Sequence, residues 1–291
     1  MAENESDDTV QRKQRISGMF SRAAPTYDRV GPRFFSYFGQ SLVDFAQIKR
    51  GENVLDVATG RGAALFPAAR SVGKNGHVVG TDLSETMVEE TRKEIQHRDL
   101  KNVDVLQMDA ECLQLPDETF DFVLCGFALF FFPQLDRALA EIWRVLKPGG
   151  FLAVSTWEKY EDERWKWFDQ LVESYFPPEE EKPLNSSVQP PPPTLDTPES
   201  IEAVLKAAGF MVLESKTESF ETIYKSEEEW WAAQWSHGGR VLLERIESTL
   251  GRQGLEQFRK ATFKGLSERK ESDGIHSHWP ALLTLAKKLD N

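Results

Sequence analysis

The feature that most constrains the fold is an apolar run that ends in a glycine-rich turn. Residues 54–62 read Val-Leu-Asp-Val-Ala-Thr-Gly-Arg-Gly, and a second apolar run, residues 78–81, leads into Asp82. Glycines after a buried strand let backbone N–H groups approach a ligand, and a carboxylate after the next strand can accept hydrogen bonds from ribose hydroxyls. The two runs therefore predict parallel strands that bind an adenosine-containing cofactor at their carboxyl ends.

The residues of the turn favour S-adenosylmethionine over a dinucleotide. Gly60 and Gly62 lack the third glycine that a pyrophosphate-binding loop uses, and the acidic Asp56 precedes Gly60 by four positions. A negative charge there suits a cofactor with positive charge, and S-adenosylmethionine carries an ammonium and a sulfonium group. A nucleotide-dependent oxidoreductase is the weaker alternative.

Composition limits the partners of the chain. The 291 residues include 40% hydrophobic residues and carry a net charge of −12, so a sizeable core can form and nucleic acid is not an expected partner. Cys112 and Cys125 both lie in apolar segments, and we expect them to be buried thiols. The acidic residues 1–8 do not resemble a secretory signal, and no apolar window is long enough to span a membrane, so we expect a cytoplasmic protein.

Strand and helix patterns alternate through the first half of the chain. Residues 1–12 are expected to be disordered, and residues 14–48 to form short helices interrupted at Pro25 and at Gly31-Pro32. The predicted strands are 54–58, 77–81, 103–108, 120–125 and 151–157, and the predicted helices are 63–72, 85–98 and 135–146. This alternation predicts an α/β, Rossmann-like fold with a mostly parallel seven-stranded sheet and helices on both faces.

Two blocks interrupt the alternation in the second half. Residues 158–195 begin amphipathic and end in an extended proline-rich loop, and residues 227–270 form a helical block that contains three tryptophans. Between and after these blocks we expect a helix at 198–208 and strands at 210–224 and 277–287. We divide the chain into a cofactor cover (1–50), a cofactor-binding core (51–157), an insertion (158–195) and the rest of the sheet with a helical lid (196–291).

Further residues suit the adenine and the methyl group. Asp109 follows the third predicted strand, where its carboxylate can accept from the adenine amine while Ala110 donates a backbone N–H to a ring nitrogen; a turn-forming aspartate is the alternative. Gly126 and Phe127 follow the fourth strand, beside the expected position of the methyl group. Asp82 has an alternative role as a helix cap, but Ser84 is the better cap and leaves Asp82 for the ribose.

Together these blocks resemble the class I S-adenosylmethionine-dependent methyltransferases, and more narrowly the methyltransferase type 11 group, which includes ubiquinone/menaquinone C-methyltransferases. The resemblance covers residues 14–157, including the segment 20–28, which resembles that group's N-terminal helix, whose tyrosine closes over the cofactor. It implies a cofactor site made of Tyr27, Asp56, Ala58, Gly60, Gly62, Asp82, Leu83, Met87, Asp109, Ala110, Cys125 and Gly126. Beyond Trp157 the resemblance gives no guide to the substrate.

We therefore expect methyl transfer to a small aromatic or apolar acceptor, with oxygen preferred over nitrogen or carbon, because the lid is rich in aromatic residues. Phe127, Phe130 and Trp235 are the candidate acceptor-binding residues. A protein that uses the same cofactor for another reaction, such as a cyclisation, is the alternative within this fold. An acidic interaction scaffold is a weaker one, and the oligomeric state stays open.

His237 is the candidate catalytic residue. It follows the tryptophan-rich helix, and we expect it to face the acceptor as a general base; the alternative is a histidine favoured at a helix end by the backbone dipole. His77 and His97 fall away from the site. His276 and His278 share one face of the last strand but lack an evident third ligand, so no metal site is predicted.

Overall fold

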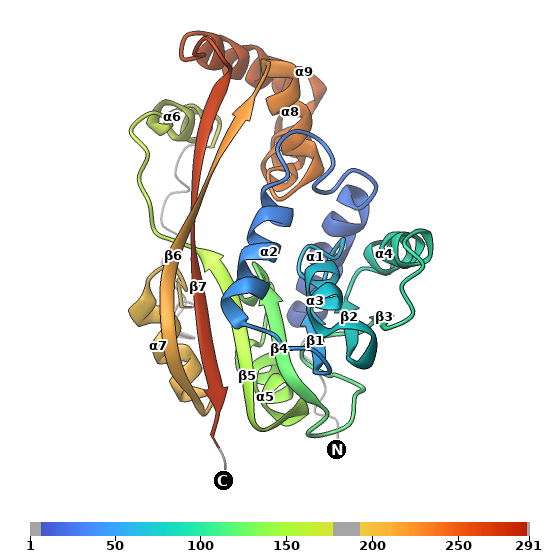
Figure 1. Cartoon of the computed structure of the whole chain (residues 1–291). Helices are drawn as coiled ribbons and strands as arrows, with labels where there is room; N and C mark the ends of the chain where they lie inside the picture. Colours follow the sequence, from blue (N-terminus) through green and yellow to red (C-terminus); the bar gives the residue numbers. More distant parts are fainter. Residues whose placement is uncertain (1–6, 177–192, 290–291) are drawn as a thin grey trace.

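A seven-stranded sheet forms the centre of the protein, of which the computed structural model describes residues 7–176 and 193–289 (Figure 1). The strands are β1 (Asn53–Val57), β2 (His77–Asp82), β3 (Val103–Gln107), β4 (Phe120–Gly126), β5 (Leu146–Trp157), β6 (Phe210–Tyr224) and β7 (Ile275–Lys288). Their order is β3-β2-β1-β4-β5-β7-β6; β7 runs antiparallel to both of its neighbours, and the other pairs are parallel. This arrangement confirms the predicted fold.

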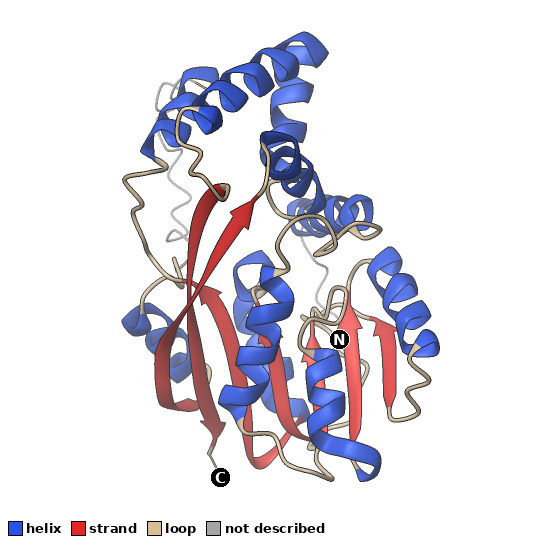
Figure 2. Ribbon diagram, turned by 45° about the horizontal axis from the view of Figure 1, so that its top comes forward, coloured by secondary structure: helices blue, strands red, loops and turns tan. Residues whose placement is uncertain are grey.

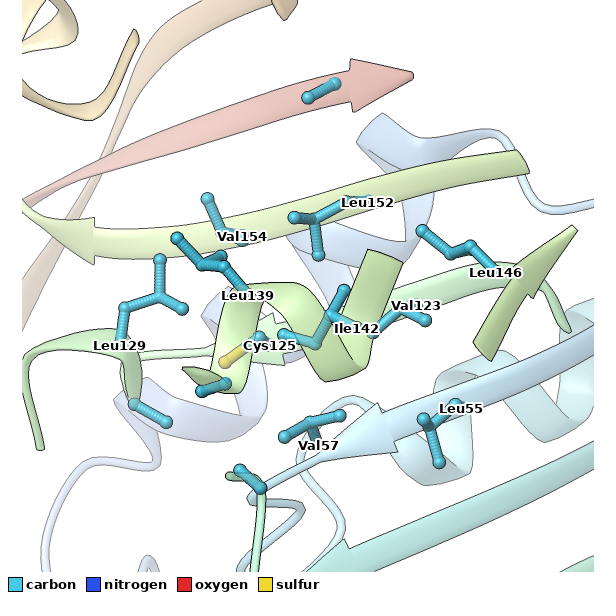
Figure 3. Close-up of a cluster of buried hydrophobic side chains, with 14 of the residues drawn as sticks. Leu55, Val57, Val123, Cys125, Leu129, Leu139, Ile142, Leu146, Leu152 and Val154 are labelled. Carbon is cyan, nitrogen blue, oxygen red and sulfur yellow. The ribbon is translucent and has the colours of Figure 1, made fainter. Parts of the chain in front are cut away.

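Helices cover both faces of the sheet, which explains why the central strands are almost wholly apolar. Val54 of β1 faces α2 (Phe34–Ala46), α3 (Leu65–Val72) and α4 (Glu85–His97), whereas Leu55 and Val57 face α5 (Leu135–Val145) and α7 (Pro198–Ala207). In Figure 3, Val57 of β1 and Cys125 of β4 lie in the same cluster as the α5 side chains. Successive side chains of β1 thus point to opposite faces of the sheet and pack into two separate hydrophobic cores, one on each face.

The amino-terminal region is helical from an earlier residue than expected. Helix α1 (Asp7–Ala23) includes residues 7–12, so the prediction of disorder is wrong for them. The reason is tertiary: Lys13 and Met19 of this helix are buried. The predicted interruptions are confirmed, because α1 ends at Ala23 and α2 begins at Phe34.

Strands β6 and β7 continue beyond the rest of the sheet as a two-stranded ribbon, which carries α8 (Glu227–Ser236) and α9 (Arg240–Ser267) (Figures 1 and 2). Helix α6 (Lys166–Tyr175) from the other predicted block packs against them. Tyr224, Trp230 and Phe258 are buried in the cluster that these three helices share, and Trp165 and Phe168 pack around it. We call α6, α8 and α9 together the helical lid.

Several element bounds differ from the sequence prediction. Strand β5 begins at Leu146 rather than at residue 151, because Leu146 already pairs with Phe120 before the ladder shifts register. Cys125 is buried as expected, but Cys112 is exposed, so the prediction is wrong for Cys112. Most of the predicted proline-rich loop lies outside the described residues. No helix in the described ranges has the length and apolar character needed to cross a bilayer.

Candidate active site

The turn after β1 adopts a conformation that requires its glycines. Gly60 and Gly62 have φ of 53° and 81°, and the loop is fixed to β2 by the N–H of Thr59, which donates to the carbonyl of Thr81 at 2.8 Å. A Cβ added at Gly62 would come within 2.5 Å of the ring of Phe66, whereas one added at Gly60 would meet no heavy atom within 4 Å. The space beside Gly60 is therefore open to a ligand.

Two carboxylates flank this open space. Asp56 is only 2% exposed and accepts a hydrogen bond from the hydroxyl of Thr59 at 2.6 Å. Asp82 accepts from the N–H groups of Gly60 at 2.9 Å and of Ser84 at 2.8 Å. Burial raises the pKa of Asp56 to about 7, with a further contribution from the nearby charge of Asp82, and burial raises the pKa of Asp82 to about 6. A cationic ligand would stabilise both groups in their charged form.

Ser84 rather than Asp82 caps helix α4. The hydroxyl of Ser84 accepts the N–H of Met87 at 3.2 Å, as the sequence predicts. The oxygens of Asp82 accept only backbone N–H groups, so each has further lone pairs for ligand hydroxyls.

A small cavity of about 90 Å³ extends from this point along the carboxyl ends of β2, β3 and β4. It brings together most of the predicted cofactor residues: Tyr27, Ala58, Gly60, Asp82, Leu83, Met87, Asp109, Ala110 and Gly126, together with Phe127. Cys125 does not line it and is buried in the core below. Asp56 and Gly62 line the neighbouring cavity instead.

Helix α1 closes the small cavity with residues that the sequence did not identify. Lys13, Ile16, Ser17 and Phe20 line it. The Nζ atom of Lys13 lies 2.7 Å from a carboxylate oxygen of Asp109 and 2.6 Å from one of Glu111. The amphipathic spacing of Ile16 and Phe20 signals a buried helix face but not what it covers, and nothing in the sequence signals the pairing of Lys13.

Asp109 has the local geometry of a turn-forming aspartate. Its Oδ1 atom accepts the N–H of Glu111 at 2.9 Å, while Oδ2 faces Lys13. Because the residue also lines the small cavity, both of its predicted roles are compatible with this position, and the contact with adenine stays a prediction.

A larger cavity of about 460 Å³ adjoins the small one. The two share Tyr27, Ala58, Gly60, Gly126 and Phe127, so they meet where β1 and β4 end. Five arginines line the larger cavity, and we call it the arginine cavity: Arg29, Arg33, Arg61, Arg70 and Arg98. No pattern in the sequence signals these arginines, which are far apart along the chain.

Aromatic side chains line and back the junction of the cavities. Tyr27 stacks on Phe35 at 5.0 Å between ring centroids, Phe35 meets Phe127 edge-on at 5.7 Å, and Phe127 packs on Trp157 at 4.2 Å. Burial raises the pKa of Tyr27, so its phenol is neutral at physiological pH. The junction therefore offers aromatic rings to a bound molecule.

His237 is 8% exposed and directly follows the last residue of helix α8. It therefore lies at a helix end, as the alternative to a catalytic role predicts. Its Nδ1 atom accepts the N–H of Gly239 at 3.3 Å, and its ring lies edge-on against Phe34 at 5.5 Å. Within the described ranges Nε2 has no hydrogen-bond partner, and burial lowers the pKa of the imidazole to about 4. A neutral ring that accepts at Nδ1 carries its proton on Nε2, so His237 can donate a hydrogen bond but is a weak base.

The other candidate acceptor residues do not reach the cavities. Phe130 packs on Phe131 at 4.8 Å and does not line the small cavity, although Phe131 and Phe132 do. Trp235 lies in the helical lid beneath the guanidinium of Arg240, 5.2 Å away. Of the three predicted residues, only Phe127 lines a cavity.

His276 and His278 do share one face of β7, where both face Glu221 of β6. Their Nδ1 atoms lie 3.2 and 3.3 Å from the two oxygens of that carboxylate, and Asp273 holds the other nitrogen of His276 at 2.9 Å. Among the described residues, one group could hold a metal ion, Glu271, Asp273 and His276, with ligand atoms within 4.8 Å of one another. None of them lines the small cavity or the arginine cavity.

These observations fit S-adenosylmethionine. Open space beside Gly60 and two buried carboxylates suit its positive charges, and the small cavity has apolar walls from Leu83 and Met87 for a flat base. The arginine cavity begins at Asp56, so the amino-acid end of the cofactor has room there.

Known proteins share this core. Residues 54–150 match the family described as a methyltransferase domain. Aklanonic acid methyltransferase DauC of Streptomyces sp. (strain C5) is 41% identical over 144 residues, which cover 50% of this chain and 66% of that protein. Demethylmenaquinone methyltransferase of Listeria welshimeri is 32% identical over 172 residues, which cover 58% and 72%. The chain thus spans about two thirds of the length of these relatives.

A solved structure is similar over almost the whole chain. The [4+2]-cyclase SpnF superimposes with a TM-score of 0.59 and 20% identity, covering 96% of this chain and 97% of that one. At this identity the likeness concerns the fold alone.

Proposed function

The chain belongs to the S-adenosylmethionine-dependent methyltransferases, and from this premise we propose that it methylates a small, largely aromatic or apolar acceptor, with oxygen as the preferred acceptor atom. The observation that carries the proposal is the junction of two cavities at Tyr27, Gly126 and Phe127. The small cavity has the features of a nucleoside site, and the arginine cavity opens beside aromatic rings.

S-adenosylmethionine supplies a methyl carbon activated by the sulfonium. We assign Asp82 to the ribose hydroxyls, Asp109 and Ala110 to the adenine, and Asp56 to the positively charged amino-acid end. Their positions around the small cavity and the floor of the arginine cavity support this assignment. The other predicted residues, Ala58, Gly60 and Gly62, would shape the loop around the cofactor.

The protein's task in such a reaction is to align the acceptor and to exclude water. Phe127 and Tyr27 stand at the junction, Phe35 lines the arginine cavity beside them, and Trp157 packs behind Phe127. We propose that an aromatic acceptor lies against these rings. The predicted division of the chain would then have three roles. The segment 1–50 would cover the cofactor, the core 51–157 would bind it, and the lid blocks 158–195 and 227–270 would enclose the acceptor.

His237 has the properties of a hydrogen-bond donor rather than of the general base first expected. His237 lines neither cavity, and its buried Nε2–H lacks a partner in the described structure. We propose that an acceptor oxygen that is already ionised accepts from this N–H while another of its lone pairs bonds to the methyl carbon and the bond from sulfur to that carbon breaks. Phe34 connects this histidine to the aromatic surface, since its ring also lies 4.3 Å from that of Phe35.

Comparison of His237→Ala with His237→Gln tests this role. Loss of one hydrogen bond to the acceptor, about 1–3 kcal/mol, lowers kcat/KM by roughly 5- to 150-fold. The glutamine variant keeps an N–H donor and is expected to retain more activity. An alanine variant with wild-type kcat/KM would remove His237 from the site.

Calorimetric titration with S-adenosylmethionine and separately with NADH tests the proposed function. We expect saturable binding of the first alone, followed by release of S-adenosylhomocysteine when aromatic hydroxy compounds are added. Binding of NADH alone would favour the oxidoreductase. Tight S-adenosylmethionine binding without S-adenosylhomocysteine release from any acceptor, but with rearrangement of a polyene substrate, would favour a cyclisation.

A further inference from the structure

We propose that the acceptor carries an anionic group, a carboxylate or a phosphate, and that the arginine cavity binds it. This inference rests on the proposed function, because it names the class of acceptor for the same site. Cofactor residues such as Asp56 and Gly62 line one part of this cavity, but its arginines have no assigned role.

The lining of this cavity has the opposite sign to the protein as a whole. The chain has a net charge of −12, but five arginines line the cavity against three acidic residues, Asp28, Asp56 and Glu94. The arginines come from the segment before α2, the glycine-rich loop, α3 and the end of α4. Separate elements of an acidic protein thus bring guanidinium groups to one hollow.

Two of these arginines form no ion pair in the described structure. Arg70 donates to the neutral side-chain oxygen of Gln40 at 2.6 Å, and no ion pair is formed by Arg33 within the described ranges. Asp28 interacts electrostatically with Arg33, but its carboxylate accepts the N–H groups of Phe35 at 3.3 Å and Ser36 at 2.9 Å. Arg33 and Arg70 can therefore bind an external anion without breaking an ion pair.

Arg29 and Arg98 share a single acid. Arg29 Nη2 lies 3.1 Å and Arg98 Nε 2.8 Å from the two oxygens of Glu94. One carboxylate thus serves two guanidinium groups, and the mouth of the cavity keeps an excess of positive charge.

Arg61 lies deeper than the other arginines of the cavity and is incompletely paired. Its side chain is only 7% exposed, and its Nη1 atom donates to the carbonyl of Ala24 at 2.5 Å and to Glu90 at 3.2 Å. Its Nε–H group is buried without a hydrogen-bond partner in the described residues. A buried donor of a charged group that is left unpaired costs free energy, so the guanidinium of Arg61 is not fully satisfied by the described residues.

The size and chemistry of the cavity suit a small organic acid. Its volume of about 460 Å³ falls in the range of roughly 300–1,000 Å³ that is usual for small-molecule sites. Planar guanidinium groups bind carboxylate and phosphate oxygens through paired hydrogen bonds. An acceptor anchored there by its anionic group would extend its body toward Phe127 at the junction.

The amino-acid end of S-adenosylmethionine also carries a carboxylate, and the test must separate it from the acceptor. We would load the protein with S-adenosylhomocysteine and measure calorimetrically the binding of hydroxylated aromatic carboxylic acids, including 1-hydroxy-2-naphthoic acid, each against its neutral carboxamide. Naphthyl phosphate, compared with the naphthoic acid, shows which anionic group binds more tightly.

We expect at least one acid to bind tenfold or more tightly than its amide. Arg33→Gln and Arg70→Gln should each weaken acid binding about tenfold and leave the affinity for S-adenosylhomocysteine within about twofold. Arg252→Gln is the matched control, because this guanidinium side chain is 95% exposed and does not line the cavity.

Two results would overturn the inference: every acid binds no better than its amide, or the Arg33 and Arg70 variants lose S-adenosylhomocysteine affinity as much as acid affinity. In the second case the arginines serve the cofactor. Failure of the wild-type protein to bind S-adenosylhomocysteine at all would instead refute the proposed function, so the two failures are distinguishable.

Discussion

Cofactor affinity should depend steeply on pH between 5.5 and 7.0, because the two carboxylates beside the glycine-rich turn are partly protonated without a ligand. Burial raises the pKa of Asp56 to about 7 and that of Asp82 to about 6. S-adenosylmethionine is positively charged at its sulfonium and ammonium groups. It should therefore bind much more tightly when both carboxylates are ionised than when they are protonated. Lowering the pH then weakens binding.

The magnitude follows from the ionised fractions. For a pKa of about 7, the ionised fraction of Asp56 rises from about 3% at pH 5.5 to about 50% at pH 7.0, which strengthens binding about 16-fold. Asp82, with a pKa of about 6, contributes a further factor of about four over the same range if both groups must be charged.

Isothermal titration with S-adenosylmethionine in the absence of an acceptor measures this effect. The α-amino group of the ligand, with an ordinary pKa of about 7.7–8.0, stays protonated over most of the range and contributes little. Asp56→Asn is the control: its affinity should be lower at pH 7.0 and should change only about fourfold with pH, through Asp82. An affinity of the wild-type protein that is constant from pH 5.5 to 7.0 would refute the reasoning.

The same groups affect the stability of the cofactor-free protein with the opposite sign. Their pKa values in the folded state lie above the ordinary value of 3.8, so folding favours the protonated form. The stability that this contributes is complete below about pH 3.8 and is lost as the pH rises through 6 to 7. The increase in Tm caused by the cofactor should therefore be larger at pH 7.0 than at pH 5.5.

Three substitutions give further tests. Asp82→Ala should weaken cofactor binding by roughly 1.5–3 kcal/mol in the same titration, since hydrogen bonds to a charged group are lost; wild-type affinity would mean that another residue holds the ribose. Gly39→Ala should lower the free energy of unfolding in urea by about 1–3 kcal/mol, because the added Cβ would overlap the carbonyl oxygen of Ala63. Gly238→Ala is its control, because its Cβ would meet no heavy atom within 4 Å, and a similar loss in both variants would contradict the packing argument. Lys13→Met should cost about 3–5 kcal/mol, because Glu111 would be left buried without its cation, and a loss below about 1 kcal/mol would show that this ion pair does not stabilise α1.

The sequence was sufficient to predict the sheet and the cofactor side of the site because both depend on local patterns. Apolar runs specify β1, β2 and β4, and the glycines and Asp82 lie within one strand–turn–helix unit and the next strand. The enzyme class and the cofactor are confirmed by the relatives, which match the same part of the chain.

The remaining features depend on contacts between distant residues. The early start of α1 could not be predicted, because the buried Lys13 pairs with Asp109 and Glu111, which lie about a hundred residues further along the chain. The short turn at Leu129–Phe131 decides which phenylalanines face the small cavity, so Phe131 and Phe132 line it, and Phe130, which the sequence predicts to bind the acceptor, does not. The arginine cavity is equally hidden, since its charges are dispersed in a sequence with an acidic total.

The β6–β7 ribbon has a consequence for how this enzyme can diversify. The chain leaves the ribbon at Tyr224 and returns at Ile275, and these two residues are direct cross-strand partners. Because the ends of the excursion are already adjacent, changes in its length alter the closure entropy only slightly and leave the register of the sheet untouched. The α8–α9 excursion is thus an exchangeable module: a different helical insert could be grafted between these two residues, with α6 repacked to match, while the rest of the sheet and the residues that line the two cavities stay unchanged.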